Sequence, residues 1–176
     1  MEPEIIIRPY KEGYQSKVTA LILQIQRFEF GIDITLNDQP DLLNIGHFYQ
    51  SKRGNFWCAI NPYDEIVGTI ALIDVENRMG VIRKMFVRQD CRGKEKNVAG
   101  DLLDALENWA HKKQFSTLYL GTIDKLKAAQ RFYVKNDYKL IDPSLLPASF
   151  PRMPVDNLFF VKILPTRYGG DRGLLR

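Results

Sequence analysis

Cysteine and histidine are scarce in this chain, which holds only two of each among its 176 residues. Domains that depend on disulfides use more cysteines in a shorter chain, so we expect a reducing compartment and no disulfide framework. Cys58 and Cys91 do not form a C-x-x-C pair, and His47 and His111 stand apart in the sequence. This spacing predicts no metal site, because a structural zinc ion needs four clustered ligands.

Long apolar runs are missing as well. No stretch approaches the roughly 20 apolar residues that a membrane-spanning helix needs. Residues 1–4 include two glutamates and lack the basic start of a secretory signal peptide. We therefore expect a cytoplasmic protein with no membrane partner.

A strong excess of one charge sign is also lacking, since the net charge is only +4. Half of that excess lies in residues 165–176, which contain three arginines and one aspartate. Nucleic-acid-binding proteins usually concentrate basic residues on one face. We therefore predict no nucleic-acid partner, and binding of nucleic acid through the basic tail is the weakest of three functional hypotheses.

What the chain does contain is the composition of an ordinary globular domain, with 45% hydrophobic and 26% charged residues. Its length suits one domain, because domains typically span about 100–200 residues. We predict a single domain over residues 1–164, followed by a basic Gly/Arg tail over residues 165–176.

Two hydrophobic periodicities predict the order of the elements. Short β-branched or aromatic runs predict strands at 4–8, 55–60, 66–75, 81–87, 117–120, 138–141 and 158–164. Apolar residues at helical spacing predict helices at 11–30, 97–110 and 125–135, and a turn at 38–41 leads into a further predicted helix that runs to about residue 50. The order β-α-α-β-β-β-α-β-α-β-β indicates an α/β (α+β) fold, and short links between the middle strands favour antiparallel pairing. The proline-rich segment 142–156 has no period, and a loop of that length is usually functional or disordered.

A polar loop over residues 88–96 joins the strand that ends at Val87 to the helix that begins near Asn97. It contains four basic residues, which are Arg88, Arg92, Lys94 and Lys96. The first turn of a helix offers backbone N–H groups without helical partners and the positive end of the helix dipole. Phosphates bind at such helix starts. The loop is therefore a candidate phosphate site, although a solvated turn with ordinary surface charge explains the same residues.

This segment resembles the GNAT superfamily of acetyl-CoA-dependent N-acetyltransferases. Residues 85–94 (MFVRQDCRGK) look like the strand and phosphate loop of that family, and residues 102–110 (LLDALENWA) look like the helix that follows. Lys94 and Asn97 stand where the family has Gln or Arg and Gly, and the displaced Arg-Gly pair indicates a lengthened loop. The resemblance implies that the pyrophosphate of CoA is held by Arg92, Gly93, Lys94, Glu95, Lys96, Asn97, Val98 and Ala99.

A second segment resembles the other motif of the family. Residues 118–122 (LYLGT) look like its strand, and residues 125–133 (KLKAAQRFY) look like its helix with an Ala-x-x-Phe-Tyr pattern. The family's sheet is mixed and mostly antiparallel, with about seven strands and helices on both faces. Two of its strands, which match 81–87 and 117–120, splay apart around the pantetheine arm. The resemblance implies further contacts with acetyl-CoA from Met85, Phe86, Val87, Thr122 and Ala129.

Tyr133 matches the tyrosine that lies beside the thioester sulfur in this family. An amine that attacks a thioester expels a thiolate, and a phenol with an ordinary pKa of about 10 can donate a proton to it. Tyr133 is thus the predicted general acid. On spacing alone, Phe132 and Tyr133 are better explained as core aromatics, and the two motifs in register favour the catalytic role.

The base that takes the proton of the amine is harder to place. Glu29 is our first candidate, because it closes a helix that borders the acceptor site in this fold; Asp33, Asp38, Asp74 and Glu76 are alternatives. We expect the acceptor pocket to lie between the first two helices and the loop 142–156. Its apolar lining is predicted from Tyr49, Trp57, Phe150 and Met153, which are otherwise core residues.

The leading hypothesis is an N-acetyltransferase that moves an acetyl group from acetyl-CoA, its co-substrate, to a primary amine by direct attack in a ternary complex. The acceptor is an unidentified small molecule or peptide. The alternative is a catalytically inactive CoA-binding sensor or interaction module, which the altered loop and the missing base favour. Because members of the family are often dimeric, a homodimer is also an expectation.

Overall fold

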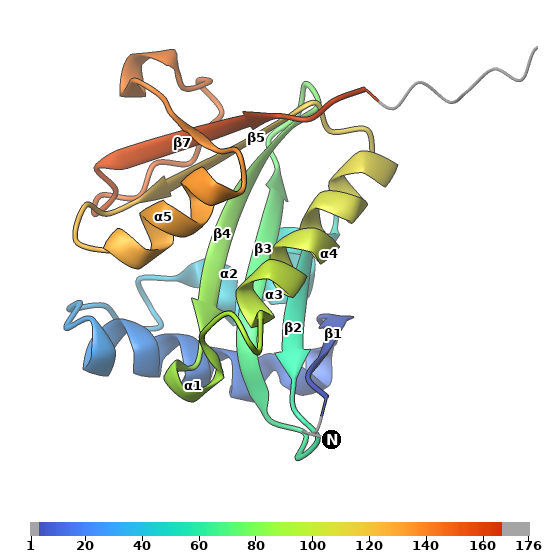
Figure 1. Ribbon diagram of the computed structural model, residues 1–176, viewed down its shortest axis with the longest axis vertical. Helices are drawn as coiled ribbons and strands as arrows, with labels where there is room; N and C mark the ends of the chain where they lie inside the picture. The colour runs from blue at the N-terminus through green and yellow to red at the C-terminus, as the bar shows by residue number, and fades with distance from the viewer. Residues whose placement is uncertain (1–3, 167–176) are drawn as a thin grey trace, which may run out of the picture.

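The computed structural model describes residues 4–166, which form one sheet of seven strands flanked by helices (Figure 1). The strands are β1 (Ile6–Pro9), β2 (Asn55–Ile60), β3 (Ile66–Asp74), β4 (Met79–Val87), β5 (Thr117–Thr122), β6 (Lys139–Leu140) and β7 (Leu158–Ile163). The helices are α1 (Gln15–Gln24), α2 (Pro40–Leu43), α3 (Ile45–Gln50), α4 (Val98–Lys112) and α5 (Lys127–Lys135), with short helical turns η1 (Glu12–Tyr14), η2 (Ile25–Glu29), η3 (Gln89–Cys91) and η4 (Pro143–Leu145). The predicted basic tail lies outside the described residues from residue 167 onward.

The strands lie in the order β1-β2-β3-β4-β5-β7-β6. The first four are antiparallel neighbours joined by short links, as expected. Strand β5 is parallel to β4 because α4 carries the chain back across the sheet. Strand β7 then inserts antiparallel between β5 and β6. The mixed, mostly antiparallel sheet of about seven strands expected from the sequence is confirmed.

Both faces of the sheet carry helices, and β2 shows why, since all six of its residues are buried. Successive side chains of a strand point to opposite faces. Trp57 and Ala59 pack in the core beneath α4, whereas Phe56, Cys58 and Ile60 pack in the core beneath α1 and α3. In Figure 1, α4 lies in front of the sheet, and α2 and α3 are seen behind it.

The first two predicted helices differ from the structure. The segment expected as one helix over 11–30 begins as a tight 3-10 turn, continues as α1 and ends in the wider π-helical turn η2, after which Gly31 adopts a left-handed φ of +63°. The helix expected after a turn at 38–41 already begins at Pro40 and is split into α2 and α3 by Asn44, whose extended backbone (φ −148°) interrupts the helix. The side chain of Asn44 accepts a hydrogen bond from the N–H of His47 at 3.3 Å, so it caps α3 instead of continuing α2.

Strands β4 and β5 pair over only part of their length. Met79–Ile82 lies opposite Thr117–Leu120, and no pairing joins the two strands beyond those residues. From there β4 continues along β3 to Val87, and β5 continues along β7 to Thr122. The two strands therefore splay apart and leave one open backbone edge on each, as the family resemblance implies.

A β-bulge interrupts β4 just where the splay begins. Thr69 pairs with Phe86 and Ala71 pairs with Arg83, so two residues of β4 lie opposite the single Ile70. Lys84, one of the two, has a left-handed φ of +53°, and its carbonyl accepts a hydrogen bond from the Thr69 hydroxyl at 2.7 Å. The bulge breaks the usual alternation, so that Lys84 and Arg83 both lie on the face covered by α1 to α3, where Ala71 also packs.

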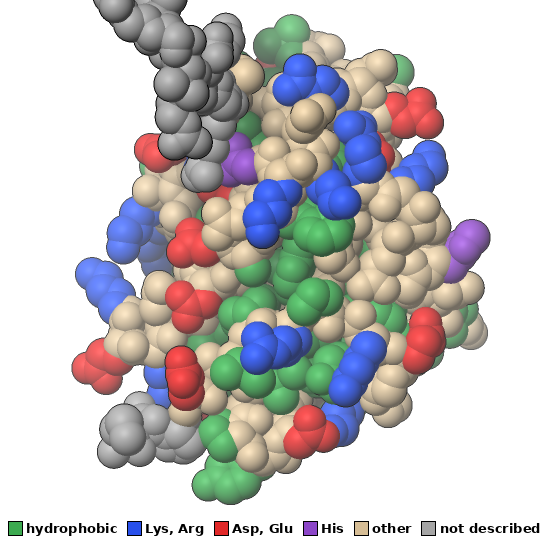
Figure 2. Space-filling view, turned by 90° about the vertical axis from the view of Figure 1, so that its right-hand side faces the viewer, with side chains coloured by type: hydrophobic (Ala, Val, Ile, Leu, Met, Phe, Trp, Pro, Cys, Tyr) green, Lys and Arg blue, Asp and Glu red, His purple; other side chains and the backbone are tan. Residues whose placement is uncertain are grey.

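The face of the molecule in Figure 2 carries charged side chains of both signs, with apolar side chains exposed between them. Within residues 4–166, no helix combines the length and the apolar character needed to cross a membrane. The same residues contain no cluster of three or more His, Cys, Asp or Glu side chains positioned to hold a metal ion.

Candidate functional site

A cleft of about 1090 Å³ opens where β4 and β5 separate. Its walls come from the end of β4, the loop that precedes α4, the α5 region, and two segments on either side of the splay, residues 25–39 and 150–156. This volume lies just above the roughly 300–1,000 Å³ that is usual for small-molecule sites. The cleft is therefore large enough for an extended ligand such as a nucleotide coenzyme.

Most of the residues predicted to contact acetyl-CoA line this cleft. They are Met85, Phe86, Val87, Arg92, Gly93, Lys94, Asn97, Ala99, Thr122 and Ala129. Glu95, Lys96 and Val98 do not line it. The side chain of Val98 packs in the core, and the Lys96 ammonium turns back to donate a hydrogen bond to the carbonyl of Asp90 at 2.9 Å.

 The first turn of α4 faces the cleft, where Ala99 and Gly100 present only small side chains. Asn97, just before the helix, has a left-handed φ of +47°, a conformation that asparagine tolerates better than most residues. The N–H groups at the start of a helix have no partners within it and carry the positive end of its dipole. This turn therefore has the general properties that favour an anion at a helix start.

Arg92 joins the phosphate loop to the end of the first helical segment. Its guanidinium forms a two-pronged ion pair with the carboxylate of Glu29, in which Nη2 lies 2.8 Å from Oε2, and its Nε donates to the carbonyl of Val87 at 2.8 Å. Glu29 does not line the cleft. Its carboxylate thus holds the loop in place, and the structure does not bring this predicted base to the point where β4 and β5 separate.

The opposite wall of the cleft carries a row of basic side chains that the sequence reasoning missed. Lys127, Arg131 and Lys135 follow one another at intervals of four residues on α5, so they form one stripe along the helix, and all three line the cleft. Lys125, just before α5, lines it too. The four-residue spacing was the available signal, but the motif interpretation used only the apolar side of this helix.

Tyr133 lines the cleft from α5 and is 5% exposed. Its ring packs against Phe132, Tyr138 and Phe160, with centroids 5.5 to 6.1 Å apart. Its hydroxyl has no hydrogen-bond partner within residues 4–166, yet no buried polar side-chain atom of that range is left unpaired, so the hydroxyl reaches the open space of the cleft. Burial raises the pKa of the phenol, which keeps it protonated and able to donate.

Asp156 is a second residue that the sequence reasoning missed as a site residue. It lines the cleft at the end of the proline-rich segment, against Gly121 of β5. A Cβ atom at Gly121 would lie 2.4 Å from the Asp156 carboxylate, so the glycine makes room for it. Burial raises the pKa of the carboxyl to about 6, although Arg83 and Lys84 act in the opposite direction. Its segment has no periodicity, and nothing in the sequence marks this carboxylate among the other surface acids.

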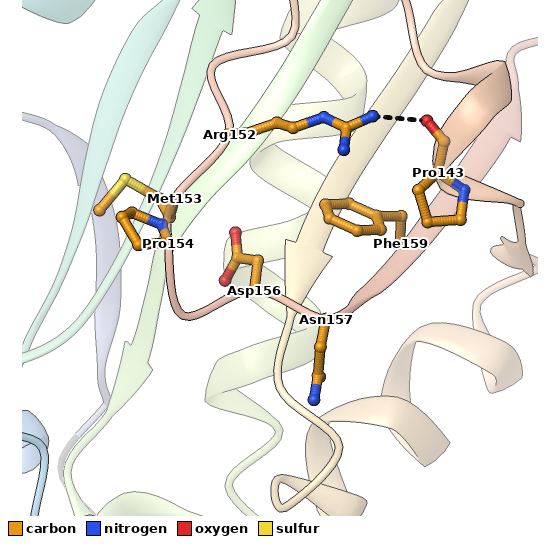
Figure 3. Close-up of a pocket in the computed structure, with 7 residues that line it drawn as sticks. All are labelled: Pro143, Arg152, Met153, Pro154, Asp156, Asn157 and Phe159. Carbon is orange, nitrogen blue, oxygen red and sulfur yellow. Dashed lines mark hydrogen bonds between the residues drawn. The ribbon is translucent and has the colours of Figure 1, made fainter.

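Figure 3 shows the surroundings of Asp156 from a neighbouring hollow of about 550 Å³. Its carboxylate points to the side on which Met153 lies, and the Asn157 side chain extends in another direction. Asn157 fixes this end of the loop, because its N–H donates to the carbonyl of Thr122 at 3.0 Å and its side chain accepts from the N–H of Asp124 at 2.9 Å. Asp156 and Met153 line both the hollow and the cleft, so they form the wall between them.

Lys84 belongs to a buried polar network beside the cleft. Its ammonium lies 2.5 Å from the Gln39 side-chain oxygen and 3.4 Å from an Asp41 carboxylate oxygen, and that same oxygen accepts a hydrogen bond from Tyr49 at 2.5 Å. The amides of Gln39 and Gln26 bond to each other at 2.9 and 3.0 Å. Burial lowers the pKa of Lys84 to about 8, with Asp41 opposing the shift.

Two of the four aromatic or methionine residues expected in the acceptor pocket line the cleft, namely Phe150 and Met153. Tyr49 and Trp57 lie in the two cores instead, at 1% and 4% exposure.

Among the alternative bases, Asp74 forms an ion pair with Arg53 at 3.0 Å, and Asp38 accepts hydrogen bonds from Thr35. Neither carboxylate lines the cleft.

Comparison with known proteins agrees with this geometry. Residues 20–138 match the family model described as the acetyltransferase (GNAT) family. The chain belongs to the GNAT acetyltransferase family. A crystal structure of a GNAT-family acetyltransferase from Staphylococcus aureus Mu50 is 42% identical, with a TM-score of 0.88, and the match covers 92% of this chain and 99% of that one.

Two further GNAT-fold relatives are more distant. "Probable N-acetyltransferase 14" of Xenopus tropicalis is 29% identical over 122 residues, which cover 69% of this chain and 58% of that protein, so the match spans little more than half of its length. The PaiA N-acetyltransferase of Thermoplasma acidophilum, solved in complex with coenzyme A, has a TM-score of 0.69 at 17% identity, and the match covers 92% of this chain and 99% of that one. At that identity the likeness shows the fold alone.

Proposed function

We propose that this GNAT-family protein is an N-acetyltransferase that moves an acetyl group from acetyl-CoA to a primary amine by direct attack in a ternary complex. The proposal depends on one observation. A single cleft joins the start of α4, the open edge of β4 and the hydroxyl of Tyr133. The expected cytoplasmic location and homodimer stay predictions.

The residues of one side of the cleft, which we call the donor half, suit acetyl-CoA. The donor half comprises Met85–Val87, the loop and helix start at 92–100, and the α5 region at 122–135. The diphosphate would lie against the start of α4, where backbone N–H groups and Lys94 supply positive charge. The open edge of β4 offers backbone groups to the amides of the pantetheine arm, because β5 does not pair with it beyond Ile82.

Acetyl-CoA would supply the acetyl group as a thioester, whose carbonyl carbon forms the new C–N bond as its C–S bond breaks. Tyr133 would give its proton to the departing sulfur, and its protonated phenol and its hydroxyl, which is open to the cleft, support this role. Met85, Phe86 and Val87 supply backbone donors near the same point. Such donors stabilise the negative charge that develops on a carbonyl oxygen during acyl transfer.

The proton of the amine goes to Asp156 in this proposal, in place of the predicted Glu29. An amine is protonated at neutral pH and must lose a proton before it can attack. A carboxylate with a pKa of about 6 is ionised at neutral pH and closer to the ideal for a base than an ordinary aspartate. Asp156 also lines the cleft, whereas Glu29 is held by Arg92 outside it.

Isothermal titration with acetyl-CoA tests the donor half. We expect binding in the micromolar range, and we expect Lys94→Glu to weaken it about tenfold, since the change places a negative charge on the cleft wall. Lys139→Glu makes the same change of charge on β6, outside the cleft, and should alter the affinity less than about twofold. Equal effects of the two variants would contradict the assignment of the phosphate site.

Release of CoA thiol in the presence of a panel of primary amines tests catalysis. Turnover with any amine, together with tight binding of acetyl-CoA, is the expected result. Binding without turnover on a broad panel would favour the inactive CoA-binding module instead. No binding of acetyl-CoA at high micromolar concentration would overturn both interpretations.

A further inference from the structure

Two opposite charges face the cleft without an ionic partner. Arg83 forms no ion pair within residues 4–166. Its guanidinium instead donates a hydrogen bond from Nη2 to the sulfur of Met153 at 3.1 Å. A thioether is a weak acceptor, so this contact leaves most of the five N–H donors of arginine free. The Asp156 carboxylate has no hydrogen bond or ion pair within the same residues.

Lys84, the cation next to Arg83 in the chain, already has an ionic partner. Lys84 lines the cleft too, but its ammonium is bonded to Gln39 and paired with Asp41, and its side chain is 5% exposed. No such carboxylate lies against Arg83. Of these two adjacent cations, Arg83 is therefore the one that can bind an anionic group of a ligand.

The fold brings Arg83 and Asp156 to the same place. Arg83 is the first residue of β4 beyond its last pair with β5, at Ile82 and Leu120, and Asp156 lies against Gly121, the residue after Leu120. The two charges are close enough for Arg83 to lower the pKa of Asp156, but they do not form a direct ion pair. Both side chains line the cleft, which therefore offers a ligand with two opposite charges one partner for each.

Apolar side chains surround this pair. Phe150, Met153 and Val155, from the segment that ends in Asp156, line the cleft. Ile32 and Ile34 line it from the segment after α1. We call Arg83, the segment 150–156 and these two isoleucines the acceptor half of the cleft.

We propose that the acceptor is an amino acid with an apolar side chain, whose ammonium group lies on Asp156 and whose carboxylate lies on Arg83. This inference rests on the proposed function and names its substrate class. A guanidinium binds a carboxylate in two-pronged geometry, and a charged hydrogen bond of this kind contributes more than a neutral one. The apolar residues would cover the side chain, and Asp156 would take the proton of the amine.

Three amines that share one side chain test the proposal. Leucine has both charges, leucinamide keeps the ammonium but has a neutral amide, and isoamylamine has no group in place of the carboxylate. Their kcat/KM values are compared after correction for the fraction of free amine at the assay pH, because the three amines differ in pKa. We expect leucine to exceed both of the others by about tenfold or more, the range of a charged hydrogen bond.

Arg83→Gln separates this role from a structural one. It should remove the preference for leucine over leucinamide within the same variant, mainly through a higher KM for leucine, while acetyl-CoA affinity stays within about twofold. Arg83→Lys should restore part of the preference for leucine, since lysine returns the positive charge but not the planar guanidinium that binds a carboxylate through two hydrogen bonds. Arg152→Gln is the matched control: Arg152 lies on the same segment, but it does not line the cleft and donates to the carbonyl of Pro143 at 2.6 Å.

The outcomes are distinct. Isoamylamine or leucinamide acetylated as well as leucine would overturn the proposal and leave the enzyme assignment standing. Equal effects of Arg83→Gln and Arg152→Gln would overturn it as well. Binding of acetyl-CoA with no transfer to leucine, phenylalanine or methionine would exclude this acceptor class, whereas no binding of acetyl-CoA would refute the proposed function itself.

Discussion

The donor and acceptor halves of the cleft are built in different ways. The donor half comes from two continuous stretches of chain, each a strand, a loop and a helix, and its cations are mostly exposed on loops and helix surfaces. The acceptor half is assembled from Arg83 of β4, from Ile32 and Ile34, and from residues 150–156, which lie far apart in the sequence. It rests on a buried network in which Lys84, Asp41 and Gln39 are 7%, 3% and 1% exposed.

The donor half is suited to a group that many ligands share, whereas the acceptor half is suited to selecting one class of ligand. Exposed lysines and helix N–H groups bind any diphosphate in much the same way. Buried and directional charges discriminate between ligands, because a mismatched group leaves them unpaired at high cost. We therefore expect changes in the donor half to alter affinity gradually and changes in the acceptor half to have large effects on stability or selectivity.

The largest expected effect is the loss of Lys84. Lys84→Met leaves Asp41 charged and buried without its cation, which should lower the free energy of unfolding by about 3–5 kcal/mol. Lys94→Met in the donor half should change it by less than about 0.5 kcal/mol, since that side chain is exposed. Urea unfolding measures both. A Lys84→Met variant as stable as Lys94→Met would contradict the contrast between the two halves.

A double variant sharpens this test. Adding Asp41→Asn to Lys84→Met removes the unpaired charge, so the two changes together should cost less than the sum of the single changes. Strict additivity would mean that Lys84 and Asp41 do not depend on each other.

The second largest effect concerns Tyr133. Tyr133→Phe removes the proton donor and should slow turnover about 100-fold, while acetyl-CoA affinity stays within about twofold. Tyr138→Phe is the matched control, because Tyr138 loses the same atom from a neighbouring ring but bonds to Glu107 at 2.9 Å outside the cleft. Single-turnover kinetics and titration separate the two quantities. If both variants slow turnover equally, Tyr133 is a packing residue.

The contrast between the halves also explains what the sequence could predict. The phosphate loop and Tyr133 could be predicted because each stands in a motif that resembles the GNAT family, beside a strand and a helix with clear periodicity. Lys84 points to the sheet face covered by α1–α3 only because a bulge breaks the alternation of side chains along β4. No residue pattern in the sequence predicts that bulge. Asp156 depends on the absence of a side chain at Gly121, a contact across 35 positions of the chain that local patterns do not contain.

The third effect is a stability gain from removing Asp156. Its pKa of about 6 exceeds the value of about 3.9 in an unfolded chain, so the unfolded chain ionises first as the pH rises. Folded stability therefore falls between about pH 4 and pH 6 and does not recover above that window. Asp156→Asn should stabilise the protein by about 1–2 kcal/mol at pH 7.5, after allowance for partial exposure, and by nothing measurable at pH 4.

Asp142 offers a control of opposite sign for that experiment. Hydrogen bonds from Ser144 lower the pKa of its exposed carboxyl, so its contribution is present at neutral pH and is lost as the pH falls. Asp142→Asn should thus lower stability slightly at pH 7.5. Urea unfolding at both pH values measures the two variants, and a destabilised Asp156→Asn protein at pH 7.5 would show that the carboxylate is not strained by burial.

The smallest effect belongs to the basic stripe of α5. Arg131→Gln should weaken acetyl-CoA binding only about two- to threefold, because Lys127 and Lys135 remain on either side of it and solvent screens all three. The difference from the unaltered protein should shrink further as salt is raised, since screening shortens the reach of exposed charges. Lys139→Gln, outside the cleft, should have no effect at either salt concentration. A loss of affinity of more than tenfold for Arg131→Gln that persists at high salt would mean that this arginine makes a direct, desolvated contact with acetyl-CoA. The donor half would then discriminate between ligands in the way that we assign to the acceptor half alone.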